Sequence, residues 1–226
     1  MMKPKLETIE IYTNPNKEYN STVIWMHGLG ADGYDFVHVI EQLQKIKNKN
    51  IKFILPHAPI RSITINNHVE MRAWFDIYSL ERSSHQDIEG VTNSKDLIID
   101  IINDENNINN IPYENISIAG FSQGGALALF TGLTFPKKLN SILALSCYLP
   151  IHDVFLSLKE NKNINTPIFL AHGVNDPIIP LNFSSESRDF LEKLNYNVIF
   201  TEYQMEHSVC AQEIKDIDDF FNTYLP

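Results

Sequence analysis

The sequence predicts an α/β fold with a mostly parallel sheet and helices on both of its faces. Short segments rich in β-branched and aromatic residues alternate with longer segments whose apolar residues recur three or four positions apart. Several short segments are apolar almost throughout, as strands covered on both faces must be. Because 226 residues can bury one core and no Pro/Gly/Ser-rich linker divides them, we expect residues 1–226 to form a single domain.

Six segments are expected to be strands and five to be helices. In chain order the strands are residues 21–27 (STVIWMH), 51–55 (IKFIL), 115–121 (NISIAGF), 140–146 (NSILALS), 167–172 (PIFLAH) and 196–202 (YNVIFTE), all rich in aliphatic or aromatic side chains. The helices, from their apolar spacing, are residues 34–46, 91–102, 124–134, 184–194 and 209–224. Such alternation places a ligand site at the carboxyl ends of parallel strands.

Charge and cysteine usage exclude several classes of function. Lys and Arg number 18 against 28 Asp and Glu, a net charge of −10 without a basic stripe, so we expect no nucleic-acid partner. No apolar run approaches the roughly 18 residues of a membrane span, and residues 1–12 lack the apolar centre of a signal peptide. Cys147 and Cys210 lack zinc-site spacing and are expected to be thiols in a reducing, cytoplasmic setting.

Seven of the nine glycines lie at expected carboxyl ends of strands, and three of them surround one serine. Residues 120–124 (GFSQG) have the G-x-S-x-G pattern between an expected strand and an expected helix, as a nucleophile elbow requires. The sharp turn would present the Ser122 hydroxyl above the sheet, with flanking glycines because a Cβ would collide with backbone. Ser122 is therefore the predicted nucleophile, and a plain strand-to-helix turn is the alternative.

A serine hydroxyl is a weak nucleophile unless a base takes its proton and a third group orients that base. Asp176 follows the expected strand 167–172, and His207 follows the expected strand 196–202. Both positions are at carboxyl ends of strands, where they can converge on Ser122. The chain order serine, acid, histidine is the order found with a nucleophile elbow.

Other residues compete for these two roles. Glu206 adjoins His207 and could be the acid in place of Asp176. His152 and His172 also lie beyond the serine, but both precede the acid in the chain. His172 is expected instead to pack or hydrogen-bond under the loop that follows it.

Acyl transfer also needs two N–H donors for the oxyanion. The backbone of Gln123, next to the nucleophile, supplies one donor, and Leu29, in the glycine-rich loop after the first expected strand, is predicted to supply the other. A phosphate-binding loop is the alternative, but residues 27–33 lack both the G-K-[ST] ending and the G-x-G-x-x-G spacing. We expect no metal and no organic cofactor.

The sequence resembles the acyl-protein thioesterase and carboxylesterase family of α/β-hydrolases. The matching stretches are WMHGLGADGYDF (25–36), PHAPIRSIT (56–64), MRAWFDI (71–77), GFSQGGALAL (120–129), LALSCYLP (143–150), AHGVNDPIIP (171–180) and MEHSVC (205–210). The resemblance implies the α/β-hydrolase fold, a triad of Ser122, Asp176 and His207, and the oxyanion positions named above. It also implies hydrolysis of esters or thioesters of medium and long acyl chains, and a homodimer. Cys147 is a departure, because relatives often have Gly there.

Two features are expected to shape the acyl pocket. Trp74 and Phe75, with Met71 nearby, are predicted to wall it, and plain core packing is an equal alternative. The polar segment 78–86 (YSLERSSHQ) is either a lid or an ordinary surface loop.

Together these features predict a serine carboxylesterase that cleaves carboxylic esters, and acyl thioesters, of short to long chains through an acyl-enzyme. The alternatives are a protein depalmitoylase, that is an acyl-protein thioesterase acting on S-acylated proteins, and a non-catalytic ligand-binding protein on the same fold.

Overall fold

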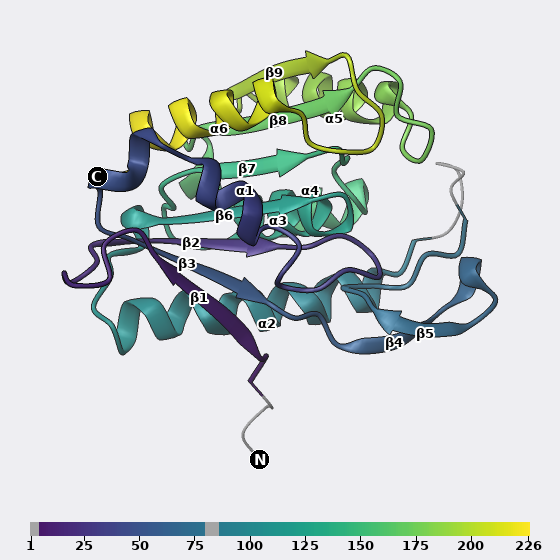
Figure 1. Cartoon of the computed structure of the whole chain (residues 1–226). Helices are drawn as coiled ribbons and strands as arrows, with labels where there is room; N and C mark the ends of the chain where they lie inside the picture. The colour runs from purple at the N-terminus through teal and green to yellow at the C-terminus, as the bar shows by residue number, and fades with distance from the viewer. Residues whose placement is uncertain (1–4, 80–85) are drawn as a thin grey trace.

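The computed structural model describes residues 5–79 and 86–226, and a sheet of seven strands forms its centre (Figure 1). Neighbouring strands are parallel except at one edge, where β1 pairs antiparallel with β3. The order across the sheet is β1 (Thr8–Tyr12), β3 (Ile51–Pro56), β2 (Ser21–Met26), β6 (Ile116–Phe121), β7 (Ile142–Leu145), β8 (Ile168–Gly173) and β9 (Val198–Tyr203). The predicted α/β class with a mostly parallel sheet is confirmed.

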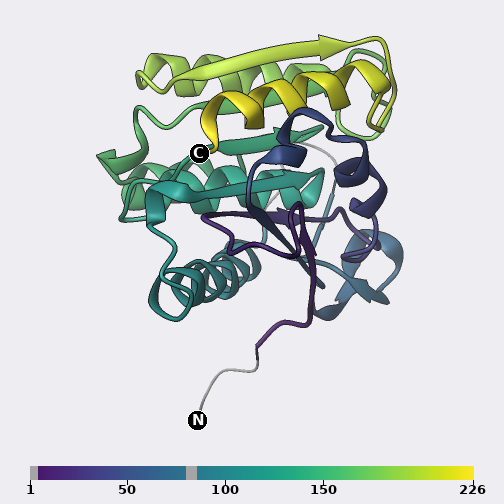
Figure 2. The ribbon, with the colours of Figure 1, turned by 60° about the vertical axis from the view of Figure 1, so that its left-hand side comes forward.

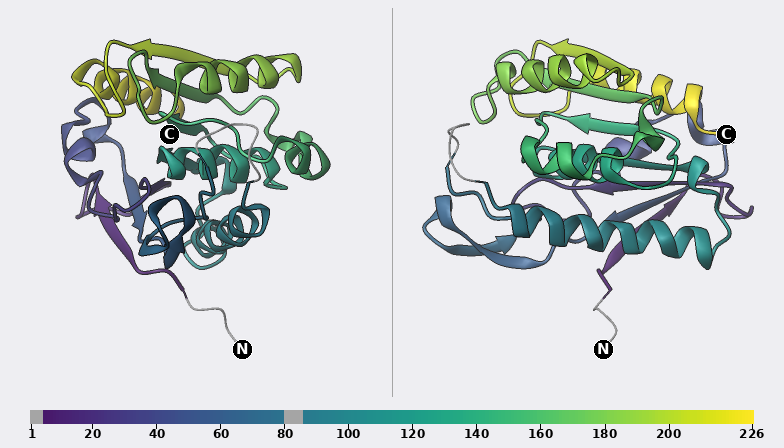
Figure 3. Two further views of the ribbon diagram at one scale, coloured as in Figure 1. Left: turned by 90° about the vertical axis from the view of Figure 1, so that its right-hand side faces the viewer. Right: turned by 180° about the vertical axis from the view of Figure 1, so that it is seen from behind.

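Helices cover both faces of the sheet (Figures 2 and 3). One face carries α2 (Ile88–Asn107), α3 (Gln123–Thr134), α4 (His152–Leu158) and α5 (Leu181–Lys193), and the other carries α1 (Val37–Gln42) and α6 (Ala211–Tyr224). Alternate residues of β2 enter the two cores: Ile24 packs in the first and Val23 in the second. This two-sided cover explains why the strand is apolar throughout. Among the described residues, no helix is long and apolar enough to cross a membrane.

The helix expected over residues 34–46 is shorter and is broken by a contact with the far end of the chain. α1 ends at Gln42, and a 3₁₀ turn, η1, covers Lys45–Asn48. The backbone N–H groups of Gln44 and Lys45 each donate to one carboxylate oxygen of Asp218, at 2.8 Å. This carboxylate of α6 satisfies amide groups that a continuous helix would have bonded internally.

Four elements were not expected from the sequence: β1, α4 and the two strands of a hairpin, β4 (Ile60–Ile63) and β5 (Val69–Arg72). β1 is a half-exposed edge strand, and the hairpin strands have only four residues each, so none of the three has a continuous apolar run. In the segment 78–86, expected to be either a lid or an ordinary surface loop, residues 80–85 lie outside the described residues.

Candidate active site

Ser122 lies in a strained turn between β6 and α3. Its φ of 55° and ψ of −119° are rare for a residue with a side chain. The turn is held on both sides, because Ser122 N–H donates to the Leu145 carbonyl at 2.8 Å and the Ser122 carbonyl accepts from Ala126 N–H at 3.0 Å. A Cβ on Gly120 would lie 2.2 Å from the Gly124 carbonyl oxygen, so a side chain is excluded there. The GFSQG segment therefore forms the elbow that its pattern predicts.

Ser122, His207 and Asp176 form one continuous chain of hydrogen bonds. His207 Nε2 lies 2.9 Å from Ser122 Oγ, and His207 Nδ1 lies 2.6 Å from Asp176 Oδ2. The loops after β6, β8 and β9 supply the three side chains. Since the carboxylate can only accept, Nδ1 carries the proton and Nε2 is left to accept from the serine hydroxyl. Asp176, and not the exposed Glu206, contacts the histidine.

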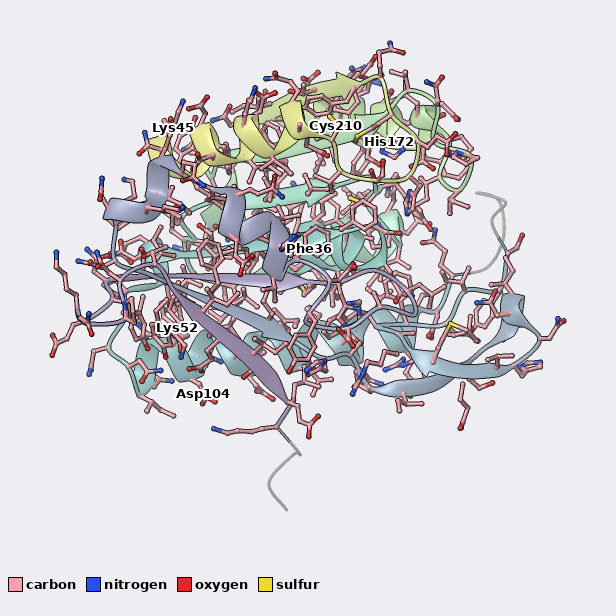
Figure 4. The ribbon with its side chains drawn as sticks, viewed as in Figure 1. Phe36, Lys45, Lys52, Asp104, His172 and Cys210 are labelled. Carbon is pink, nitrogen blue, oxygen red and sulfur yellow. The ribbon has the colours of Figure 1, made fainter. Side chains whose placement is uncertain are left out.

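The Asp176 carboxylate is held by three further groups. Its Oδ1 accepts the backbone N–H groups of Ile178 and Ile179, at 2.8 and 2.9 Å. His172 Nε2 lies 3.3 Å from Oδ2 and donates to the Ile179 carbonyl at 2.8 Å. Burial lowers the pKa of His172, which favours its neutral form. His172 thus hydrogen-bonds under the loop, as expected, and lies at the carboxyl end of β8 (Figure 4).

A cavity of about 420 Å³ opens beside Ser122 and His207. Leu29 and Gln123, the predicted oxyanion residues, both line it. Gln123 begins α3, where a helix leaves its first N–H groups without intrahelical partners. No backbone carbonyl of the described residues accepts from the Leu29 N–H. Both N–H groups therefore remain available to a ligand.

Of the three residues predicted to wall the acyl pocket, the structure brings only Phe75 to the cavity. Trp74 is fully buried in the core, and Met71 packs near Gly30 and Asn66; neither lines the cavity. For Trp74 the plain-core alternative therefore describes its position. Neighbouring side chains leave the backbone in different directions, so the sequence RAWFD does not reveal which of them faces a ligand.

Several cavity residues were missed by the sequence analysis. The apolar ones are Ile65, Ile77, Val91, Ala126, Tyr148, Pro150, Ile178, Ile179 and Phe183, and the carboxylates are Asp35, Asp76 and Asp87. Three of these had a usable signal: Tyr148 follows β7, and Ile178 and Ile179 follow Asp176, so all three lie after carboxyl ends of strands. Asp35 lies between β2 and α1, and Pro150 lies between β7 and α4. The others come from α2 and its N-cap, α3, α5 and the hairpin region, where apolar spacing indicates only burial.

The two thiols lie apart from this chemistry. Cys147 is fully buried, and burial raises the pKa of its thiol far above the usual range. Its Sγ packs where a Cβ on Gly125 would come within 2.9 Å, so this departure from the family pattern fills space behind α3. Cys210 caps α6, accepting from the Glu213 N–H at 3.5 Å. Among the described residues, no cluster of His, Cys, Asp and Glu could hold a metal ion.

A sequence model of the Phospholipase/Carboxylesterase family matches residues 7–225. The chain belongs to this family. Among its relatives, the Neurospora crassa protein named acyl-protein thioesterase 1 is 41% identical over 217 residues, covering 92% of this chain and 88% of the relative. The Yarrowia lipolytica protein of the same name is 38% identical over 204 residues, covering 88% and 89%.

Solved structures of two plant proteins have the same fold as this member of the Phospholipase/Carboxylesterase family. Arabidopsis thaliana SOBER1 superposes with a TM-score of 0.85 at 29% identity, over 90% of this chain and 98% of that one. Zea mays acyl-protein thioesterase 2 gives 0.85 at 25% identity, over 96% and 98%. The protein is therefore an α/β-hydrolase and an enzyme, a carboxylic ester hydrolase or thioesterase, which decides against a non-catalytic binding protein.

Proposed function

We propose that this enzyme is an acyl-protein thioesterase that also cleaves simple carboxylic esters, with Ser122, His207 and Asp176 as its catalytic triad. The observation that carries the proposal is the hydrogen-bonded chain from Ser122 to Asp176, which opens on a largely apolar cavity. Similarity over nearly the whole chain to proteins named acyl-protein thioesterase supports the thioester substrate.

In this mechanism Ser122 Oγ attacks the acyl carbonyl carbon while His207 Nε2 takes its proton. The oxyanion that forms is stabilised by the N–H groups of Leu29 and Gln123. The intermediate collapses, the thiolate or alkoxide leaves with the proton of His207, and the acyl group stays on Ser122. Water then attacks the acyl carbonyl carbon while His207 takes its proton, and the second intermediate releases the carboxylic acid as His207 returns that proton to Ser122 Oγ. Asp176 orients the imidazole and stabilises its cation in both half-reactions.

The acyl chain would lie along the apolar cavity wall, which includes Phe75, Val91, Ala126 and Phe183. Each buried methylene contributes about 0.8 kcal/mol, or roughly a fourfold gain in kcat/KM while the chain still finds wall to contact. Medium and long chains should therefore be preferred over acetate. The cavity needs no metal or organic cofactor for this chemistry.

An esterase of small molecules is the second candidate, because the matching family is described as Phospholipase/Carboxylesterase and the site chemistry is the same. The two functions differ in the group that leaves. The test compares release of acyl chains from an S-acylated protein with hydrolysis of p-nitrophenyl esters of graded length, using Ser122→Ala as the inactive reference. Turnover of the esters without any deacylation of the protein would favour the small-molecule esterase.

Two further features are proposed: a homodimer, from the family resemblance, and a cytoplasmic location, from the cysteine usage. The thiols Cys147 and Cys210 are both free, which is compatible with a reducing compartment.

A further inference from the structure

We propose that the side chains of Gln123 and Trp74 are positioning residues that set the oxyanion donors relative to one another and place Phe75 in the cavity wall. The inference rests on the proposed acyl transfer. It assigns roles to two side chains that contact neither Ser122 Oγ nor His207 in any hydrogen bond of the described residues.

The first observation is the pair of hydrogen bonds that the Gln123 side-chain amide makes to a neighbouring backbone segment. Its Oε1 accepts from Trp74 N–H at 2.8 Å, and its Nε2 donates to the Phe75 carbonyl at 2.7 Å. The side chain is buried, so water does not replace these partners. Because one acceptor and one donor are required at the same place, a carboxylate or an apolar side chain cannot make both bonds. Gln123 thus connects its own backbone N–H, one oxyanion donor, to the residue that lines the cavity.

The second observation continues this connection to the other oxyanion donor. Trp74 is fully buried, and its indole Nε1–H donates to the His27 carbonyl at 2.8 Å. Ser94 Oγ donates to the Trp74 carbonyl, which holds the residue from the α2 side. The His27 carbonyl begins the loop in which Leu29 lies two residues later. The tryptophan therefore acts as a rigid spacer between the Gln123 amide and the Leu29 loop.

The loop is also held from the His27 ring. His27 Nε2 accepts from Ala58 N–H at 3.0 Å, so Nδ1 carries the proton and donates to the Gly28 carbonyl at 2.7 Å. Burial lowers the pKa of His27 to about 4, which keeps the imidazole in the neutral form that this pattern needs. A Cβ on Gly28 would lie 3.4 Å from Ser122 Cβ, which shows how closely the loop approaches the nucleophile.

These contacts matter because oxyanion donors act only within a narrow range, about 2.7–3.1 Å from the developing charge. A shift of the Leu29 loop would weaken stabilisation of the transition state more than binding of the substrate. The loop would still be attached without the indole bond, because Gly30 N–H donates to the Arg72 carbonyl at 2.8 Å. Loss of the indole N–H should therefore change geometry without releasing the loop.

The test is Trp74→Phe, which removes the N–H donor and keeps an aromatic ring. Trp25→Phe is the matched control, since Trp25 is as deeply buried but its Nε1 has no hydrogen-bond partner among residues 5–79 and 86–226. Gln123→Met is the second variant and removes both amide bonds. For each we measure kcat and KM with p-nitrophenyl butyrate, the affinity for an alkylboronic acid that forms a tetrahedral serine adduct, and Tm.

We expect Trp74→Phe to lower kcat by about 10-fold or more, with little change in KM, and to weaken boronate binding by a similar factor. Trp25→Phe should keep kcat within about twofold of the unmodified enzyme, even if its Tm falls as much as that of Trp74→Phe. Gln123→Met should lose kcat and also lose preference for octanoate over acetate esters, because Phe75 is no longer held.

Equal kcat in Trp74→Phe and Trp25→Phe, or a loss of kcat without a loss of boronate affinity, would overturn the inference while leaving the proposed function intact. Failure of the unmodified enzyme to turn over any acyl ester above the Ser122→Ala background would overturn the proposed function and the inference with it.

Discussion

Glu213 is a buried carboxyl group that should limit the stability of this protein at neutral pH. It lies in the first turn of α6, fully buried, and neither of its carboxylate oxygens makes a hydrogen bond of good geometry in the described residues. Burial raises the pKa of Glu213 from 4.5 to about 8; the nearby Cys210 backbone N–H opposes this rise in part, and Asp216 adds a smaller increase. The group is therefore protonated in the folded protein at pH 7 and ionised in the unfolded chain.

The sign and size of the effect follow from proton linkage. Because the pKa of Glu213 is higher in the folded state, its contribution to the free energy of unfolding is complete below pH 4.5. This contribution decreases as pH rises and levels off above pH 8. At pH 7 the folded state must hold a proton that the unfolded state releases, 2.5 pH units above the unfolded pKa of 4.5. At about 1.4 kcal/mol per unit this costs about 3 kcal/mol.

Glu213→Gln keeps the shape and removes the ionisation, so it should raise the free energy of unfolding by up to about 3 kcal/mol at pH 7 and by little at pH 5. The assay is urea denaturation at pH 5, 6, 7 and 8. Glu192→Gln, which changes an exposed carboxylate of α5, is the control and should run parallel to the unmodified protein. If the Glu213→Gln curve also runs parallel to it between pH 5 and 8, the reasoning about this carboxyl is wrong.

Four further predictions concern the site. Ser122→Ala should abolish ester turnover and labelling by a fluorophosphonate while keeping Tm; residual turnover by the pure variant would contradict the triad. Asp176→Asn should lower kcat by about 10⁴-fold, because the imidazole loses its orienting acceptor. A larger loss of kcat in Glu206→Gln would show that Glu206, and not Asp176, is the acid. Phe75→Ala should lower kcat/KM for octanoate esters more than for acetate esters, whereas a uniform loss would remove Phe75 from the acyl wall. Gly173→Ala should lower kcat, because its Cβ would lie 2.4 Å from the Met205 and Glu206 carbonyl oxygens in the loop that carries His207; unchanged kinetics would show that this loop yields freely.

The parts of the fold that the sequence predicted are those whose burial is local and continuous. The six expected strands correspond to β2, β3, β6, β7, β8 and β9. The first five are buried on both faces and are therefore apolar at nearly every position. β9 is a half-exposed edge strand, and it was predicted from the apolar run at residues 198–200. β1 and the β4–β5 hairpin were not predicted, because these exposed strands have no continuous run of apolar residues. The early end of α1 depends on Asp218, more than 170 positions away, and the local spacing of apolar residues cannot predict such a distant contact.

The same limit applies inside the site. The structure brings the predicted residues Ser122, Asp176 and His207 together because each is fixed to the carboxyl end of a strand by a short loop. Trp74 and Phe75 are adjacent in sequence and differ completely in role, since one is a core residue and the other lines the cavity. Which side chain faces the ligand is decided by the Gln123 amide, which holds their backbone from another element.

The glycines at the strand ends give the site its order, and they do so mainly through close packing. A Cβ on Gly124 would lie 2.3 Å from the Met26 carbonyl oxygen, and one on Gly173 would lie 2.4 Å from the carbonyl oxygens of the loop before His207. Of the glycines in the described residues, Gly30 is the one with a positive φ, so backbone freedom is not their general purpose. Glycine lets backbone press directly on backbone where β2, β6, β8 and β9 end. Because the loops that carry Ser122, Asp176 and His207 are packed in this way, the distances of 2.9 and 2.6 Å between their side chains are set by the fold before any substrate binds.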